Sequence, residues 1–391
     1  MINDSVMIQR PDYMNQLSTA VGRSPITALL GPRQCGKTTL ARIYAQDKHT
    51  HFFDLESPLD LNRLQNPELM LRSLDGIVII DEIQEMPALF KVLRVVVDRP
   101  DNRTRFLILG SASPDIIKNV SETLAGRVEF VELSGFGIGE TGVDKADVVW
   151  LRGGFPRSFL ADSDADSFAW REGFIRTFLT RDIPQLGITI PPPAMRRFWT
   201  MLAHYHGQTW NATELGRSLD LSDKTVRSYL DILTGTFMVR QLQPWYENIG
   251  KRQVKAPKVY LRDSGLLHGL LSLQDIQTLH GHPRVGASWE GFAIEQALET
   301  LRPPQAFFWA TYSGAEIDLF LIHHGRRVGI ECKFSESPKT TRSMKQAMES
   351  LKLDHLWVIY PGEHAYPISD KISVLPLKEI LSLPEQFRDA F

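Results

Sequence analysis

Residues near the start of the chain have the types and the spacing that bind a polyphosphate. Gly31-Pro-Arg-Gln-Cys-Gly36-Lys37-Thr38 matches the pattern G-x-x-x-x-G-K-[ST] at every fixed position, after an apolar run and before a helical pattern. Glycines let the backbone curl so that its N–H groups face phosphate oxygens, and the following helix adds the partial positive charge of its N-terminus. We expect Lys37 to reach the β- and γ-phosphates, Thr38 to bind Mg²⁺ through its hydroxyl, and Thr39 to lie beside the nucleotide. The pattern predicts a site for ATP with Mg²⁺; the alternative is a glycine-rich turn with a solvated lysine.

A second motif, Ile77-Val78-Ile79-Ile80-Asp81-Glu82, supplies two acids at the end of an apolar run. Four consecutive apolar residues are typical of a strand that is buried on both faces of a parallel sheet. Asp81 then lies at the carboxyl end of the strand, where open α/β sheets bind ligands, and it can hold Mg²⁺ through water. Glu82 is suited to orient and deprotonate the attacking water. Pure nucleotide-binding switches often lack this second acid, so its presence favours ATP hydrolysis.

Two further residues could contact the phosphates or the attacking water. Ser111 follows the apolar run Phe106–Leu109, which places it at a strand end, although a serine there is also an ordinary turn residue. Arg127, in Leu124-Ala125-Gly126-Arg127, carries a guanidinium that suits the charge developing on a transferred phosphoryl, and a neighbouring subunit could supply it. A structural salt bridge is the alternative role of Arg127.

Near the C-terminus, charged side chains fall on one face of a predicted hairpin. Side chains of a strand alternate between its faces, so Glu316 and Asp318 share one face of the first strand with Phe320 and Ile322. In the second strand, Glu331 and Lys333 alternate with apolar residues in the same way. The other face of the first strand carries Ile317, Leu319 and Leu321.

A turn centred on His324-Gly325 fixes which charges meet. It sets Asp318 opposite Glu331 and Glu316 opposite Lys333. Two carboxylates ~5 Å apart at an effective dielectric constant of 20 repel by about 3 kcal/mol. A divalent metal held by Asp318 and Glu331 removes this repulsion, and Lys333 could then steady an attacking water or a phosphate. The alternative is an exposed hairpin whose charges are solvated.

Between these two motifs lies a pattern of two short helices and a hairpin. Asn211-Ala-Thr-Glu214 predicts a capping box that opens a helix through Leu219, and Ser222 caps a second helix over Asp223–Leu233. Strands are expected at Phe237–Gln243 and Val259–Leu261. Helix, turn, helix and hairpin together resemble a winged helix-turn-helix.

Positive residues of this region predict a contact with DNA. Lys224 and Arg227 lie on the outer face of the second helix, and Arg227 could enter a groove of DNA. The hairpin would contact phosphates. A protein-interaction module is the alternative, since winged helices serve both roles. The hairpin concentrates its positive charge in Lys251, Arg252, Lys255, Lys258 and Arg262.

The elements that must position these residues predict an α/β chain. Five short apolar runs alternate with helical patterns, as in a parallel sheet covered by helices. We expect a P-loop ATPase domain at residues 1–135, a helical and winged helix-turn-helix region at 136–272, and a smaller α/β domain at 273–391. The expected strands of the sheet are Ile26–Leu30, His51–Leu55, Ile77–Ile80, Phe106–Leu109 and Val128–Leu133.

Composition limits the class of protein. A chain of 391 residues is too long for one compact core, so two or three domains are expected. A net charge of −2 gives no overall attraction to nucleic acid or anionic membranes, so such a partner must be met by a local patch. Two cysteines outside any metal-ligand spacing fit a reducing cytoplasm. No apolar run approaches the ~20 residues of a membrane span, so we expect a cytoplasmic protein without membrane contact.

The C-terminal charges resemble the core of PD-(D/E)xK nucleases. In that core a strand aspartate, a Glu-x-Lys on the next strand and a glutamate on the preceding helix bind Mg²⁺; Asp318, Glu331 and Lys333 match. The resemblance implies that Glu290, in Ser288-Trp289-Glu290-Gly291-Phe292, is the helical glutamate. Ile317 replaces the proline that usually precedes the aspartate, which lowers the specificity of the match. Metal binding and cleavage are separate consequences of the resemblance, because many such folds are inactive.

The chain as a whole resembles a family of bacterial and archaeal P-loop ATPases of the AAA+ (ASCE) class, whose C-terminal region contains a winged helix and an endonuclease-like end. The resemblance implies ATPase activity and association with DNA. Relatives often form rings, which would suit Arg127 acting on a neighbouring subunit. The stretches that carry it are Gly31–Thr39, Ile79–Gln84, Gly110–Ser113, Leu124–Arg127, Gly153–Pro156, Arg181-Asp182-Ile183-Pro184 and Glu316–Lys333.

Three functions follow from these motifs. The first is a DNA-associated ATPase, such as a remodelling or branch-migration motor. The second is an ATP-regulated, metal-dependent nuclease that cuts with Asp318, Glu331 and Lys333. The third is an ATP-switched scaffold or sensor with a vestigial nuclease-like domain.

Overall fold

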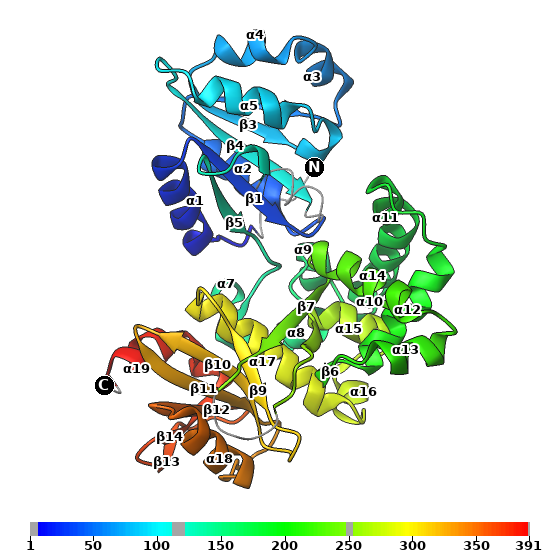
Figure 1. Cartoon of the computed structure of the whole chain (residues 1–391), viewed down its shortest axis with the longest axis vertical. Helices are drawn as coiled ribbons and strands as arrows, with labels where there is room; N and C mark the ends of the chain where they lie inside the picture. The colour runs from blue at the N-terminus through cyan, green and yellow to red at the C-terminus, as the bar shows by residue number, and fades with distance from the viewer. Residues whose placement is uncertain (1–6, 112–121, 248–252, 390–391) are drawn as a thin grey trace. The chain divides into compact units, whose positions relative to one another are not determined.

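The structure is a computed structural model that describes residues 7–111, 122–247 and 253–389 (Figure 1). The chain forms two compact units, Met1–Gly135 with Gly235–Phe237, and Phe136–Thr234 with Met238–Phe391. The chain therefore passes from the first unit to the second after Gly135.

The first unit is built on a parallel sheet of five strands, with the spatial order β2-β3-β4-β1-β5. All five apolar runs form strands of this sheet, which confirms the predicted parallel α/β architecture. The strands are β1 (Ile26–Gly31), β2 (Thr50–Asp54), β3 (Gly76–Asp81), β4 (Thr104–Ser111) and β5 (Val128–Glu132); the helices are α1 (Pro11–Arg23), α2 (Lys37–Ala45), α3 (Pro58–Arg63), α4 (Pro67–Arg72), α5 (Leu89–Val97) and the 3₁₀ turn η2 (Ile83–Glu85).

Consecutive apolar residues of β3 pack on both faces of this sheet. Val78 and Ile80 belong to a hydrophobic cluster that includes α5, whereas Ile79 belongs to a second cluster that includes α1 and α2. Helices on both faces explain why the strand is continuously apolar rather than alternating. The phosphate-binding loop follows the carboxyl end of β1.

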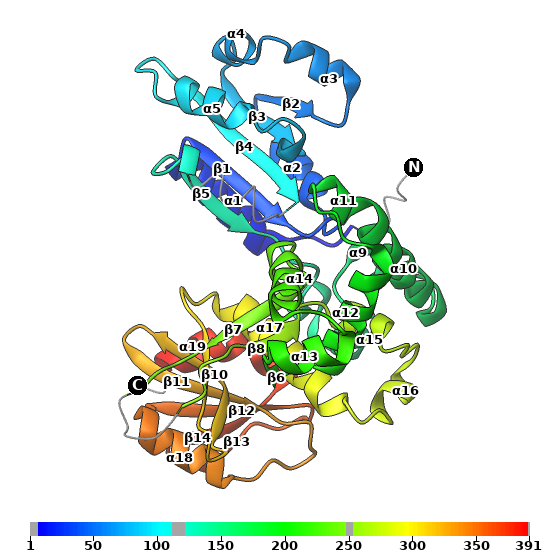
Figure 2. The ribbon, with the colours of Figure 1, turned by 45° about the vertical axis from the view of Figure 1, so that its right-hand side comes forward.

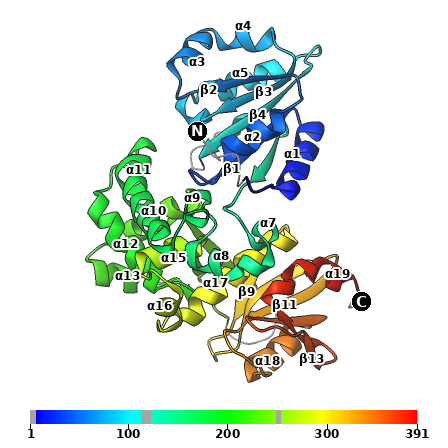
Figure 3. The same cartoon turned by 180° about the vertical axis from the view of Figure 1, so that it is seen from behind.

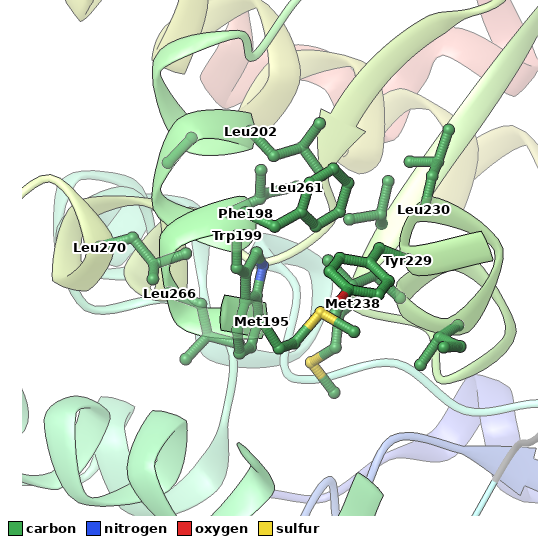
Figure 4. Close-up of a cluster of buried hydrophobic side chains, with 14 of the residues drawn as sticks. Met195, Phe198, Trp199, Leu202, Tyr229, Leu230, Met238, Leu261, Leu266 and Leu270 are labelled. Atoms are coloured by element: carbon green, nitrogen blue, oxygen red, sulfur yellow. The ribbon is translucent and has the colours of Figure 1, made fainter. Parts of the chain in front are cut away.

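The second unit begins with helices packed around an aromatic core. Met195, Phe198 and Trp199 of α12 meet Tyr229 and Leu230 of α14 in this core (Figure 4). The helices from Ile138 to Gly235 are α7 (Ile138–Thr141), η3 (Val143–Lys145), α8 (Ala146–Arg152), α9 (Pro156–Phe159), α10 (Asp164–Thr177) with the π-helical segment η4 (Phe178–Asp182), α11 (Ile183–Gln185), α12 (Pro192–His204), α13 (Ala212–Leu219) and α14 (Asp223–Gly235). Helices α15 (Ser264–Leu270), α16 (Ile276–His280) and α17 (Val285–Leu301) come later in the chain.

One sheet of nine strands runs through this unit, in the order β13-β14-β12-β11-β10-β9-β7-β8-β6 (Figure 2). The connection is the parallel pairing of β7 with β9, in which Gln243 lies beside Phe307. The strands are β6 (Gln208–Thr209), β7 (Val239–Pro244), β8 (Lys258–Leu261), β9 (Phe307–Ala310), β10 (Glu316–His323), β11 (Arg326–Cys332), β12 (His355–Tyr360), β13 (Tyr366–Ser369) and β14 (Ile372–Pro376). Strands from 136–272 and from 273–391 therefore share one sheet inside one compact unit.

Helices cover the two faces of the C-terminal part of this sheet. Leu356 and Val358 of β12 pack in a cluster with α18 (Arg342–Leu351). Trp357 instead packs against the tilted ring of Phe387 in α19 (Leu383–Asp389), which follows η5 (Leu377–Ser382). Helix α17 contacts β10, β11 and α19, so it lies on the face opposite α18 (Figure 3). This arrangement directs α17 toward the charged hairpin.

The predicted register of the hairpin is confirmed. This holds from the turn as far as Leu319, which lies opposite Ile330 in the β10–β11 pair, and the turn residues His324 and Gly325 have φ of 47° and 79°. The predicted face pattern of β10 is wrong in one respect.

The pairing of β10 with β9 shifts between Ile317 and Phe320, and both residues then pack in the same hydrophobic cluster. A bulge of this kind turns the residues after it to the other face of the strand, so Phe320 does not share a face with Asp318.

Candidate functional site

The phosphate-binding loop connects β1 to α2 with a geometry that requires glycine. Gly36 has φ of 99° and immediately precedes Lys37, the first residue of α2. A Cβ on Gly31 would lie 2.2 Å from the carbonyl oxygen of Leu133, the residue that follows β5. The loop therefore curls closely against the neighbouring strand, as a backbone that surrounds a phosphate must.

Lys37 and Thr38 already point into this loop. Lys37 is 5% exposed, and its ammonium donates hydrogen bonds to the carbonyl oxygens of Gly31 at 3.0 Å and Pro32 at 2.9 Å. The Thr38 hydroxyl donates to Asp81 Oδ2 at 2.7 Å. The two sequence motifs, which lie 43 positions apart, thus meet through one hydrogen bond.

Asp81 and Glu82 end β3 at the same edge of the sheet. Burial raises the pKa of Asp81, although the hydrogen bond from Thr38 opposes this shift. Glu82 has φ of 54°, so the strand stops and its side chain turns away from the ladder. Gln84 donates a hydrogen bond to the Glu82 carboxylate, which holds its orientation. A hydroxyl and a carboxylate side by side fit the ligands that Mg²⁺ prefers, so the residues present suit a Mg²⁺–nucleotide.

Two other predicted residues of this site have different positions. Ser111 is buried and pairs with Gly31 across β1 and β4, so it lies at the site. Arg127 lies at the amino ends of the strands, where its carbonyl oxygen accepts a hydrogen bond from Ile26, and its guanidinium pairs with Asp98 at 2.6 and 2.8 Å. The structure does not bring Arg127 to the nucleotide site of its own chain. Its role on a neighbouring subunit stays a prediction.

Arg10 is a positioning residue that the sequence analysis missed. Its buried guanidinium donates to the carbonyl oxygens of Cys35 at 3.3 Å, Ser134 at 3.2 Å and Gly135 at 3.0 Å. It therefore ties the back of the phosphate-binding loop to the segment after β5. A single arginine before a helix carries no sequence signal for such a role.

In the second unit, a cluster of carboxylates surrounds a lysine. Asp318 of β10 and Glu290 of α17 lie within 3.5 and 3.2 Å of Lys258 Nζ, and Glu316 also pairs with this ammonium. The predicted members Glu290 and Asp318 are thus brought together, with Lys258 between them. Burial alone would lower the pKa of Lys258, but the acidic groups around it, Tyr260 and Glu290 first, raise it well above its usual value.

Glu331 and Lys333 extend this cluster along β11. Lys333 Nζ lies 2.6 Å from Glu331 Oε1, while Glu331 Oε2 is buried and has no hydrogen-bond partner. Burial, followed by the charge of Asp318, raises the pKa of Glu331 to about 8. Asp318 Oδ2 accepts a hydrogen bond from the backbone N–H of Cys332 at 2.9 Å. The alternative of an exposed, solvated hairpin is excluded, because Asp318 and Glu331 are each 4% exposed.

Lys258 and Tyr260 belong to this cluster, although neither was predicted to. Lys258 was expected to add to the positive surface of the β7–β8 hairpin, and this is wrong because its side chain is 4% exposed. Arg262, expected on the same surface, is directed to Glu295, 3.7 Å away. Tyr260 donates from its hydroxyl to Glu290 Oε1 at 2.6 Å. The alternation Lys258, Tyr260 in an otherwise apolar strand was the only sequence signal.

Three of the five predicted DNA-binding residues are exposed, and the other two lie outside the described residues. Lys224 and Arg227 are exposed on α14, and Lys255 is exposed before β8. Lys251 and Arg252 lie outside the described residues. The surrounding elements follow the order α12, β6, α13, α14, β7, β8, with β8 antiparallel to both β6 and β7.

Three family models match successive parts of the chain: an AAA domain at residues 23–142, a domain of unknown function (DUF8612) at 144–277, and another (DUF4143) at 285–380. The uncharacterized proteins Mb2031c of Mycobacterium bovis and Rv2008c of Mycobacterium tuberculosis are each 51% identical over 377 residues, which cover 96% of this chain and 86% of each relative.

A solved structure, the Walker-type ATPase PABY2304 of Pyrococcus abyssi, is similar with a TM-score of 0.50 and 14% identity. The match covers 68% of this chain and 96% of that one. At this identity the similarity concerns the fold alone. Among the described residues, no helix has the length and apolar character to span a bilayer.

Proposed function

This chain belongs to the family of AAA-domain P-loop proteins that includes Mb2031c and Rv2008c, and we propose that it binds and hydrolyses ATP with Mg²⁺ and acts on DNA. The observation that carries the ATPase part is the hydrogen bond from Thr38 to Asp81, because it joins the phosphate-binding loop to the acidic strand end. The family models of the remaining chain name no activity, so the DNA part rests on the second unit's own residues.

Each residue of the nucleotide site has a distinct task in this proposal. The ammonium of Lys37 leaves the carbonyl oxygens of its own loop for the β- and γ-phosphates, since a phosphate is a stronger acceptor than a carbonyl. Thr38 and Asp81 would hold Mg²⁺, which would neutralise charge on the phosphates. Glu82 accepts the proton of the attacking water, and Gln84 keeps its carboxylate in place until then.

The DNA contact is supported by the exposed face of α14. Lys224 and Arg227 are three positions apart, so they project from the same side of the helix. The element order around them is that of a winged helix-turn-helix, in which the second helix of the pair meets a groove of DNA. Assembly into a ring, with Arg127 reaching a neighbouring subunit, is part of the proposal and requires Arg127 to release Asp98.

The ATPase is tested by turnover with and without single-stranded, duplex and junction DNA. Glu82→Gln should lower turnover by ~10²–10⁴-fold and leave ATP bound, since the lost group acts on water rather than on the nucleotide. Glu85→Gln is the matched control, because Glu85 is an exposed glutamate three positions away and should change turnover less than twofold. Full turnover in Glu82→Gln, or no ATP uptake by the nucleotide-free wild type, would contradict the proposal.

The DNA contact is tested by the salt dependence of binding. Replacing Lys224 and Arg227 by Ala should flatten the slope of log K against log[salt] by about 1.8, if both contact phosphates of duplex DNA. Arg342 and Lys345 are the control pair, since they are exposed with the same spacing on α18. Equal slopes for both double variants would favour the alternative, in which ATP switches a scaffold or sensor.

A further inference from the structure

A buried ammonium lies inside the carboxylate cluster of the second unit. Carboxylate oxygens of Glu290, Glu316 and Asp318 lie within 4.8 Å of one another, a spacing that could surround a metal ion. Lys258 Nζ is in contact with all three, at 3.2 Å from Glu290 Oε1 and 3.5 Å from Asp318 Oδ1. The lysine thus takes the place that a metal ion would take among them.

The backbone fixes this lysine in place. Lys258 pairs with Leu242 of β7 on one side and with Thr209 of β6 on the other, so its strand is held on both edges. Tyr260 is two positions along the same strand and projects to the same face, where its hydroxyl donates to Glu290 Oε1 at 2.6 Å. The cation and the group that orients its glutamate therefore both belong to β8.

The other carboxylate oxygens leave little room for a hydrated ion. Asp318 uses one oxygen for Lys258 and the other for the N–H of Cys332. Glu331 uses Oε1 for Lys333, and its unpaired Oε2 has almost no exposed surface. Mg²⁺ demands near-octahedral oxygen ligands and usually keeps several waters. As arranged, the residues that the PD-(D/E)xK resemblance assigns to Mg²⁺ do not fit it.

We propose that Lys258 is the resident cation of this cluster and keeps divalent metal ions out. A divalent ion at this position would have to displace a buried side chain and would meet its positive charge. The second unit therefore folds without metal and has no metal-dependent phosphodiesterase activity. This inference concerns a site separate from the nucleotide site and holds whether or not the chain hydrolyses ATP.

Removal of the Lys258 ammonium should allow the carboxylates to bind a divalent ion. Lys258→Met keeps an unbranched side chain but removes the ammonium that contacts Glu290, Glu316 and Asp318 together. Three carboxylates around one position are a hard oxygen-ligand set that suits Mg²⁺ or Mn²⁺. The variant should gain a divalent site that the wild type lacks.

The test is Mn²⁺ binding to the full chain without nucleotide, followed by electron paramagnetic resonance of the free ion. Lys258→Met should bind one Mn²⁺ per chain about tenfold or more tightly than any binding by the wild type. Adding Asp318→Asn to that variant should abolish the gain, which assigns the ion to this cluster rather than to the phosphate-binding loop. Lys255→Met is the matched control, because Lys255 is exposed and three positions away.

Two results would overturn the proposal. One is saturable Mn²⁺ binding by the wild type that Asp318→Asn removes. The other is a folded Lys258→Met chain that binds no Mn²⁺. If Lys258→Met does not fold, the wild-type measurement decides: thermal unfolding followed by tryptophan fluorescence must not shift with Mn²⁺ or a chelator. A shift that Asp318→Asn removes contradicts the proposal.

Discussion

Gly31→Ala should impair the nucleotide site through a single methyl group. The added Cβ would lie 2.2 Å from the carbonyl oxygen of Leu133, so roughly 1 Å must open between β1 and the segment after β5. That opening strains the hydrogen bond from Leu133 N to Leu30 O, now 2.7 Å, and its loss costs about 1 kcal/mol. Overpacking adds about 1–3 kcal/mol, so the first unit should lose about 2–4 kcal/mol of stability.

The substitution should also lower activity in chains that remain folded. A displacement of the loop by about 1 Å can lower turnover ~10²-fold. The assays are binding of a fluorescent ATP analogue and ATP turnover. All eight tryptophans follow Gly135, so tryptophan fluorescence reports the second unit, whose unfolding should not change. Gly22→Ala is the control, because nothing lies within 4 Å of its Cβ. ATP affinity and turnover of Gly31→Ala within twofold of wild type would refute the steric argument.

Two further predictions concern pH and are measured by tryptophan-detected unfolding of the second unit. Burial raises the pKa of Glu331 to about 8, above its unfolded value near 4.3. Between about pH 4.3 and 8 the native state therefore binds more protons than the unfolded chain, so the stability of the second unit falls as pH rises. The loss of stability over this range should be about 2 kcal/mol or more, and Glu331→Gln should reduce it. An unchanged pH profile in this variant would contradict the raised pKa of Glu331. Burial also lowers the pKa of His206 to about 3. As pH falls below about 6.5, the unfolded chain binds a proton at this histidine before the native state does, so the stability of the second unit falls as pH falls. His206→Asn can keep the hydrogen bond that Nδ1 accepts from Leu261 N and should reduce this acid sensitivity; equal acid unfolding of both proteins would count against it.

Local sequence patterns predicted the elements that are defined within a few residues. The loop from Gly31 to Thr38, the acids after β3 and the turn at His324-Gly325 all depend on short-range chemistry: φ, strand burial and turn type. The register of β10 with β11 followed from that turn alone. The bulge opposite β9 did not, because it depends on pairing with a strand that sequence analysis had not identified.

Arg127 and Lys258 show what sequence spacing could not decide. Both were assigned from their residue types, to a phosphoryl group and to a positive surface. Arg127 directly precedes β5, so it lies at the amino ends of the parallel strands, and only the tertiary packing there brings its guanidinium to Asp98. Which way Lys258 faces depends on β7 joining β9, since this pairing extends one sheet from the β7–β8 hairpin to the charged hairpin of β10 and β11.

The sequence by itself determined the nucleotide site, because a phosphate is bound mainly by the backbone of one loop and by an acid at the end of a recognisable strand. The tertiary structure alone decided the character of the C-terminal cluster. Its carboxylates come from β10, β11 and α17, while the cation that balances them comes from β8, dozens of residues earlier in the chain. Charges compensate each other through space, so a cluster can be read as a metal site or as an internal ion pair only after the fold has placed every charge.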